Sequence, residues 1–78
     1  MIIMLNDILL SGKLKKINKE EKNFSIDIFS NGHLLVLYYD KEELYEILNE
    51  KIEKIIHIRG SLSYKESRLC IIVTEIYN

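Results

Sequence analysis

Apolar and polar residues alternate along five stretches of the chain, which is the pattern of a β-strand with one buried face. In the first stretch Ile8, Leu10 and Leu14 share one parity, and most residues of the other parity are polar or charged. The second stretch places Phe24 inward and Phe29 outward. The sequence therefore predicts five strands, at residues 6–17, 24–29, 33–39, 55–62 and 68–77.

Three glycines mark places where the predicted strands bend or turn, and the chain has no proline. Gly12 and Gly60 lie inside strands, where glycine is typical of a bulge or of a bend that lets one strand serve two sides of a barrel. Asn31 and Gly32 tolerate the positive φ angles of a tight turn, so the second and third strands are expected to pair as a hairpin. Polar residues 63–67 predict another turn.

Helical spacing replaces the alternation between the third and fourth strands. Leu44, Ile47 and Leu48 form one apolar stripe at the period of an α-helix. Asp40 is placed to cap the free amide groups, in a capping box with the glutamate three residues later. The sequence therefore predicts one helix that begins after Asp40 and ends near residues 49–51.

The order of the predicted elements is three strands, one helix and two strands. This order is typical of the OB-fold, an all-β barrel of five strands, here with the helix between the third and fourth. An open sheet with one helix packed on it would show the same order, and the glycine-bent strands favour the barrel. At 78 residues, the chain is expected to form a single domain over residues 1–78.

Composition leaves few classes of chemistry open. A formal net charge of -1 argues against a protein that coats nucleic acid by bulk charge alone. The one cysteine, Cys70, cannot form an internal disulfide and fits a reducing cytoplasm as a small buried strand residue. His33 and His57 lie on different predicted strands without a carboxylate at motif spacing, and no phosphate loop, serine elbow or zinc pattern is present. We therefore expect no enzymatic activity, no metal, no cofactor, no small-molecule substrate and no membrane span.

Five short segments follow one another along nearly the whole chain in an order that belongs to a known family. They are Asn6-Asp7-Ile8-Leu9-Leu10-Ser11-Gly12-Lys13-Leu14, Asn23-Phe24-Ser25-Ile26, Leu35-Val36-Leu37-Tyr38-Tyr39, Ile56-His57-Ile58-Arg59-Gly60-Ser61-Leu62 and Val73-Thr74-Glu75-Ile76. In this order they resemble the bacterial single-stranded DNA-binding protein family. The resemblance implies an OB-fold that binds single-stranded DNA with little sequence preference, in replication, recombination or the maintenance of mobile elements and plasmids.

The chain departs from that family's pattern in several places. The loop between the second and third strands is a tight turn where the family has a long basic finger. The chain has no tryptophan, and His33 stands where the third strand of the family often carries one. The sequence contains no glycine-rich tail with an acidic tip, so we expect a shortened form without the recruitment that such a tail performs. The resemblance also implies a homodimer or homotetramer, in which the apolar residues 1–5 would extend the first strand.

Candidate binding residues follow from the way OB barrels hold single strands. Such barrels bind across the second and third strands and the loops after the first and fourth, with aromatic rings for bases and cations for phosphates. Each stacked base contributes roughly 1–3 kcal/mol by substitution. The candidates are Lys13, Lys15, Lys16, Phe29, His33, Tyr39, Arg59, Tyr64, Lys65 and Arg68.

Each candidate also has an ordinary structural explanation. Phe29 would shield the hairpin, Tyr39 would close the barrel over the helix, and the ring of Tyr64 would lie back on the sheet. The lysines would form a solvated face that neighbouring glutamates partly neutralise. We assign Tyr38 and Tyr45 to packing.

A protein-interaction barrel is the second class of function that the sequence supports. The net charge is near zero, and Leu35 and Leu37 are predicted to form an outward apolar pair. Asp27 would place a carboxylate on the binding face, and the acidic residues 42–53 should keep phosphates away from the helix. Our first hypothesis is a sequence-tolerant binder of single-stranded DNA, with RNA left open as a ligand. The alternative is an oligomeric subunit of a replication or mobile-element complex.

Overall fold

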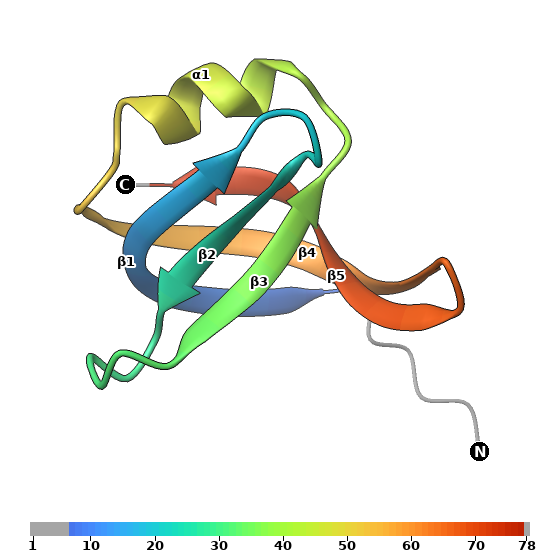
Figure 1. Ribbon diagram of the computed structural model, residues 1–78, viewed down its shortest axis with the longest axis horizontal. Coiled ribbons are helices and arrows are strands. Elements are labelled where there is room, and N and C mark those ends of the chain that lie inside the picture. The colour runs from blue at the N-terminus through green and yellow to red at the C-terminus, as the bar shows by residue number, and fades with distance from the viewer. Residues whose placement is uncertain (1–6, 78) are drawn as a thin grey trace.

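The computed structural model describes residues 7–77, whose strands close into a five-stranded barrel (Figure 1). In chain order the elements are β1 (Ile8–Asn18), β2 (Asn23–Asp27), β3 (Leu34–Tyr39), α1 (Glu43–Asn49), β4 (Ile55–Lys65) and β5 (Arg68–Tyr77). Around the barrel the order is β1-β2-β3-β5-β4, and all neighbours are antiparallel except β3 and β5. The closed barrel and the helix between β3 and β4 confirm the predicted fold class. The predicted strand extension at residues 1–5 lies outside the described residues.

β1 serves two sides of the barrel, as the prediction from Gly12 required. Its first half pairs with β4 and its second half with β2, and the partner changes at Lys13. The bulge itself falls at Lys15, where the register with β2 shifts. Gly12 avoids a tight contact, because a Cβ atom there would lie 3.0 Å from the backbone oxygen of Asp27.

Gly60 allows β4 and β5 to approach closely. A Cβ atom at this position would lie 2.5 Å from the backbone oxygen of Ile72, which is closer than such atoms can come. The register between the strands shifts beside it, so that Thr74 is the extra residue of β5. The predicted irregularity at Gly60 is therefore confirmed.

The hydrophobic core fills the barrel, and α1 covers one end of it (Figure 1). Leu44 and Leu48 are the helix residues that are buried, whereas Ile47 is 37% exposed, so the predicted three-residue stripe is reduced to two. The capping box is also wrong, because the N-cap is Glu42 and no side chain caps the helix. The core residues are Leu14, Phe24, Ile26, Leu37, Tyr39, Leu44, Leu48, Ile56, Ile58 and Val73.

Two strands differ from their predicted course. β2 ends at Asp27, so Phe29 belongs to the following loop. Ser25 is buried, although it alternates with the core residues Phe24 and Ile26 and lines a depression on the outer side of the strand. β3 turns Leu37 into the barrel with 0% exposure, so the predicted outward pair of Leu35 and Leu37 is wrong.

The β4–β5 hairpin is longer than predicted. Residues 63–65 continue β4 instead of forming the turn, which consists of Glu66 and Ser67. Both turn residues have positive φ angles, 52° and 65°, which suits a two-residue connection between antiparallel strands. The hairpin projects beyond the barrel (Figure 1).

Candidate nucleic-acid interface

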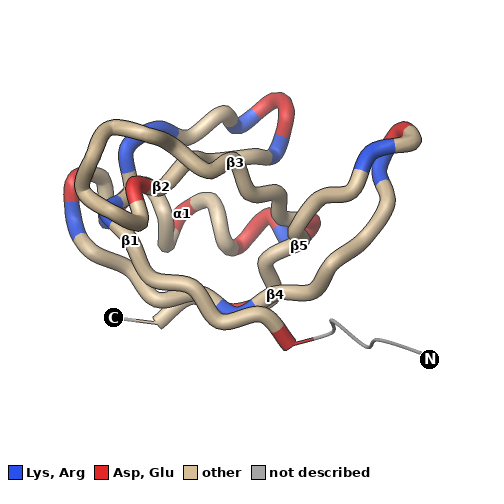
Figure 2. The backbone as a smooth tube through the Cα atoms, turned by 90° about the horizontal axis from the view of Figure 1, so that it is seen from below, with Lys and Arg blue, Asp and Glu red and all other residues tan. Residues whose placement is uncertain are grey.

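A groove crosses the outer face of β3 between the β1–β2 turn and the β4–β5 hairpin. Its volume is about 660 Å³. Both flanking segments carry charged residues, and Figure 2 shows them as two separate projections of the chain, each with basic and acidic positions. We call it the β3 groove, and it is lined by Glu21, Leu35, Val36, Tyr38, Lys65, Glu66, Arg68, Leu69 and Cys70.

Tyr38 supplies the aromatic ring of the β3 groove. Successive residues of a strand point to opposite faces, and Leu37 and Tyr39 fill the core. Tyr38 therefore faces outward, where it is half-buried. The Nζ atom of Lys65 lies 4.9 Å from the centroid of its ring, which is a cation–π contact. Our assignment of Tyr38 to packing missed this residue.

A second depression adjoins the β3 groove along the outer faces of β1, β2 and β3. Its volume is about 530 Å³, and Val36 lines both. Lys16 and Lys19 line it together with Glu20. The predicted Lys16 thus lies on the same face of the barrel as the β3 groove, on the far side of Val36 from the hairpin cations.

The β3 groove carries as many acidic as basic side chains. Lys65 and Arg68 of the hairpin supply the cations, and Glu21 and Glu66 supply the carboxylates. Figure 2 shows these opposite charges at the two flanking segments. A phosphate backbone would therefore gain little from net charge here, and ring contacts would contribute most of the affinity.

Two of the predicted cations are held by carboxylates elsewhere. The Nζ atom of Lys15 lies 2.9 Å from Glu53, in the segment between α1 and β4. Arg59 is ion-paired with Asp7 at 2.9 Å and with Glu75 at 4.0 Å, and its strand is not a neighbour of β3. The structure therefore does not bring Lys15 or Arg59 to the β3 groove.

Tyr39 is a core residue and not a stacking platform. Its side chain is 1% exposed, and its ring packs on Phe24 with centroids 6.2 Å apart. Burial raises the pKa of the Tyr39 hydroxyl, and nearby Tyr45 and Glu42 raise it further. The ordinary explanation, a ring that closes the barrel beneath the helix, is the correct one.

Phe29 and His33 lie in the loop between β2 and β3 and are not among the residues that line the β3 groove. The carboxylate of Asp27 holds this loop, because it accepts hydrogen bonds from the backbone amides of Asn31 at 3.2 Å and Gly32 at 3.1 Å. The 78% exposure of Phe29 leaves its ring open to solvent. We had expected Asp27 to place a carboxylate on the binding face, but this carboxylate stabilises the loop instead.

Tyr64 is exposed, as predicted, but its neighbouring cations face the other way. Its ring is 74% exposed, and it pairs across the hairpin with Leu69. Lys65 pairs with Arg68, and adjacent positions of a strand point to opposite faces. Lys65 accordingly contacts Tyr38 and not Tyr64. Lys13, also exposed, lies where β1 changes partner.

Comparison with solved structures identifies the architecture. The crystal structure of the mitochondrial single-stranded DNA-binding protein of S. cerevisiae superposes with a TM-score of 0.70 at 12% identity, over 96% of this chain and 94% of that one. A small single-stranded DNA-binding protein of Mycoplasma pneumoniae superposes with a TM-score of 0.59 at 24% identity, over the same shares of the two chains. The fold is an OB-fold. No family model and no curated protein matches the sequence.

Two further observations concern residues 7–77 of this OB-fold. In this part of the chain, no group of three or more His, Cys, Asp and Glu side chains is placed to hold a metal ion. No helix within the same residues is long and apolar enough to cross a membrane.

Proposed function

We propose that this protein binds single-stranded DNA in the β3 groove, with little sequence preference. The observation that carries the proposal is the outward ring of Tyr38 on β3, between two charged segments, at the place where OB barrels bind oligonucleotides. The two solved structures described above support it, because both are single-stranded DNA-binding proteins by name.

Two kinds of contact would hold a strand in the groove, base stacking and contacts to phosphates. A base that stacks on Tyr38 contributes roughly 1–3 kcal/mol. Lys65 lies over that ring, so a base must displace its ammonium group, which then becomes free to contact a phosphate. Arg68 of the hairpin and Lys16 of the adjoining depression extend the row of cations along the strand's path.

Single-strand binding also suggests the process in which the protein acts. We propose action in replication, recombination or mobile-element maintenance within the cytoplasm, as a homodimer or homotetramer without enzymatic activity. Phe29, His33 and Tyr64 are exposed and stay predicted contacts for a strand that extends beyond the β3 groove.

A protein-interaction barrel is the second candidate, and one surface favours it. Leu9 and Tyr77 are 62% and 41% exposed and line a common depression on the side of β1, β4 and β5. Ile55 at the start of β4 is 64% exposed. Exposed apolar side chains of this kind are typical of a surface that contacts another protein.

A tryptophan at position 38 tests the proposal, because the chain contains no other tryptophan. We expect oligo-dT to quench the fluorescence of Tyr38→Trp through stacking on the indole ring. Tyr77→Trp is the matched control on the other surface, and its fluorescence should not change. If the folded Tyr38→Trp variant shows no change at saturating oligo-dT, the nucleic-acid proposal fails and the protein-interaction alternative takes its place.

A further inference from the structure

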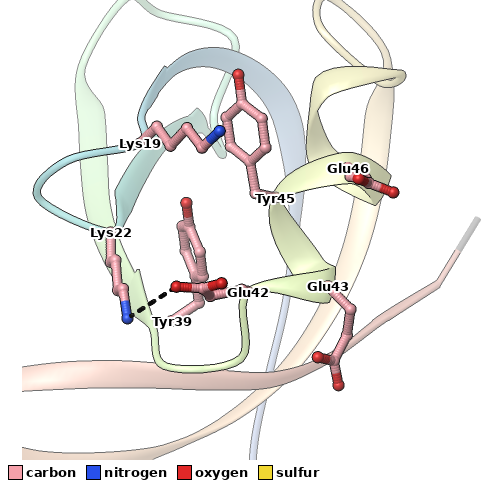
Figure 3. A pocket seen from close by; sticks show the side chains of 7 residues that line it. All are labelled: Lys19, Lys22, Tyr39, Glu42, Glu43, Tyr45 and Glu46. Atoms are coloured by element: carbon pink, nitrogen blue, oxygen red, sulfur yellow. Dashed lines mark ion pairs between the residues drawn. The ribbon is translucent and has the colours of Figure 1, made fainter.

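A pocket lies between the β1–β2 turn and the start of α1 (Figure 3). Its volume is about 340 Å³, and it shares no lining residue with the β3 groove. We call it the α1 pocket, and its lining residues are Lys19, Lys22, Tyr39, Glu42, Glu43, Tyr45 and Glu46.

The hydroxyl group of Tyr39 is the feature of this pocket that lacks an explanation. The side chain is 1% exposed, and within residues 7–77 its hydroxyl has no hydrogen-bond partner. In Figure 3 this hydroxyl is directed toward the amine of Lys19 and the ring of Tyr45. A buried hydroxyl without a partner costs free energy, and such groups in native proteins call for a ligand or another explanation.

The remaining groups of the α1 pocket are only loosely engaged. The Nζ atom of Lys19 lies 4.9 Å from the centroid of the Tyr45 ring. The Nζ atom of Lys22 lies 3.9 Å from a carboxylate oxygen of Glu42, which is beyond hydrogen-bond distance. Around the two tyrosines the pocket thus offers the ammonium groups of Lys19 and Lys22, the carboxylate of Glu42, the hydroxyl of Tyr39 and the flat ring of Tyr45.

We infer that the α1 pocket binds a guanine base. Stacking on Tyr45 would hold the flat heterocycle, after the ammonium group of Lys19 has moved off the ring. The carboxylate of Glu42 can accept hydrogen bonds from the N1–H and the N2 amino group, and a lysine can donate to O6 or N7. The hydroxyl of Tyr39 would then gain a partner. This inference does not rest on the proposed function, because the base can belong to a free nucleotide or to a strand.

Charge argues against a phosphate as the occupant. Three carboxylates line the α1 pocket against two ammonium groups. The carboxylates of Glu43 and Glu46 extend away from the two rings, so they repel an anion without contacting a base (Figure 3). The phosphate of a bound nucleotide would therefore remain outside, in solvent.

Titration of the ¹⁵N-labelled protein with GMP, IMP and TMP tests the inference by NMR. IMP carries the same phosphate and ring system as GMP but lacks the N2 amino group. We expect GMP to shift the backbone resonances of residues 39–46 and to bind about tenfold more tightly than IMP, through the hydrogen bond to Glu42. Equal affinities for GMP, IMP and TMP, or no shifts around the pocket, would overturn the inference.

Three variants make the test specific. Glu42→Gln should reduce the preference for GMP over IMP to about twofold or less. Glu43→Gln also removes one negative charge from the pocket, but this control should keep the tenfold preference. Tyr39→Phe should weaken GMP binding about fivefold without lowering the melting temperature, because the lost hydroxyl has no protein partner within the described residues. A Tyr39→Phe variant that binds GMP with unchanged affinity would contradict the role of the hydroxyl.

A second arm identifies where the base comes from. Oligo-dT and the same oligonucleotide with one central dG are compared for binding. If the dG oligonucleotide binds more tightly to the wild type but not to Glu42→Gln, the pocket takes a guanine that belongs to a strand. If GMP binds but one dG adds nothing, the free nucleotide is the ligand, and this holds even when oligo-dT itself does not bind.

Discussion

Tyr38 and Tyr39 are chemically identical neighbours with opposite roles. Tyr39 packs on Phe24 inside the barrel, and Tyr38 faces the β3 groove. The difference arises because Leu37 is fully buried, which fixes the parity of the whole strand. The sequence predicted that parity one residue out of step, so the core tyrosine was chosen as a stacking residue instead of the tyrosine that faces the groove.

Tyr38→Ala should weaken the binding of oligo-dT by roughly 5- to 150-fold, which corresponds to one lost stacking contact. Fluorescence anisotropy of a labelled oligonucleotide measures the affinity. Tyr77→Ala removes an exposed ring from the other surface and should leave the affinity unchanged. Equal effects of the two substitutions would show that Tyr38 makes no special contact.

Glu21→Gln should strengthen the binding of oligo-dT by about two- to fivefold, because it removes a carboxylate that faces the phosphates in the β3 groove. Glu50→Gln changes the net charge equally but lies at the C-terminal end of α1. The same anisotropy titration, run on both variants, separates a local effect from a general one. A gain of the same size in Glu50→Gln would count against the groove.

At the scale of the elements, the sequence predicted the order, number and type of all strands and of the helix. Alternation and glycine placement carried this result, and the bounds of β5 match residue for residue. The prediction ended β4 too early. Ser63, Tyr64 and Lys65 are polar or exposed and resemble turn residues, but the structure continues the strand through them. Helix capping failed since the first turn of α1 uses no side-chain cap.

The candidate site was only partly predictable. Lys65, Arg68 and Lys16 were predicted and lie in the β3 groove or beside it. Tyr38 was missed because β3 is apolar on both faces, so alternation alone cannot orient it. Arg59 was misplaced because its partner Asp7 is 52 positions away in the sequence, and only the closed barrel brings β1 beside β4.

Gly60→Ala should destabilise the barrel by roughly 1–3 kcal/mol, because the new methyl group would collide with the backbone oxygen of Ile72. Urea unfolding followed by circular dichroism measures the change in the free energy of unfolding. Ser61→Ala, at the next position of β4, should cost less than about 1 kcal/mol. If Gly60→Ala unfolds at the same urea concentration as the wild type, the close approach of β4 and β5 is not a constraint.

At the scale of the whole molecule, the barrel separates two kinds of surface. The β3 groove and the α1 pocket beside the acidic helix share no lining residue, although the β1–β2 turn contributes to both. Lys19 and Lys22 of that turn contact Tyr45 and Glu42 on the helix side. A net charge of -1 is therefore compatible with binding, because the helix holds much of the acidic charge away from the groove.

The titration of a fluorescent oligo-dT with the wild-type protein at low and at moderate salt tests the central claim most directly. We predict micromolar or tighter affinity at low salt, weakening as salt rises. Since about three cations, Lys16, Lys65 and Arg68, lie along the path, the slope of log K against log salt should not exceed about 2 in magnitude. An absence of binding at low salt would contradict the account.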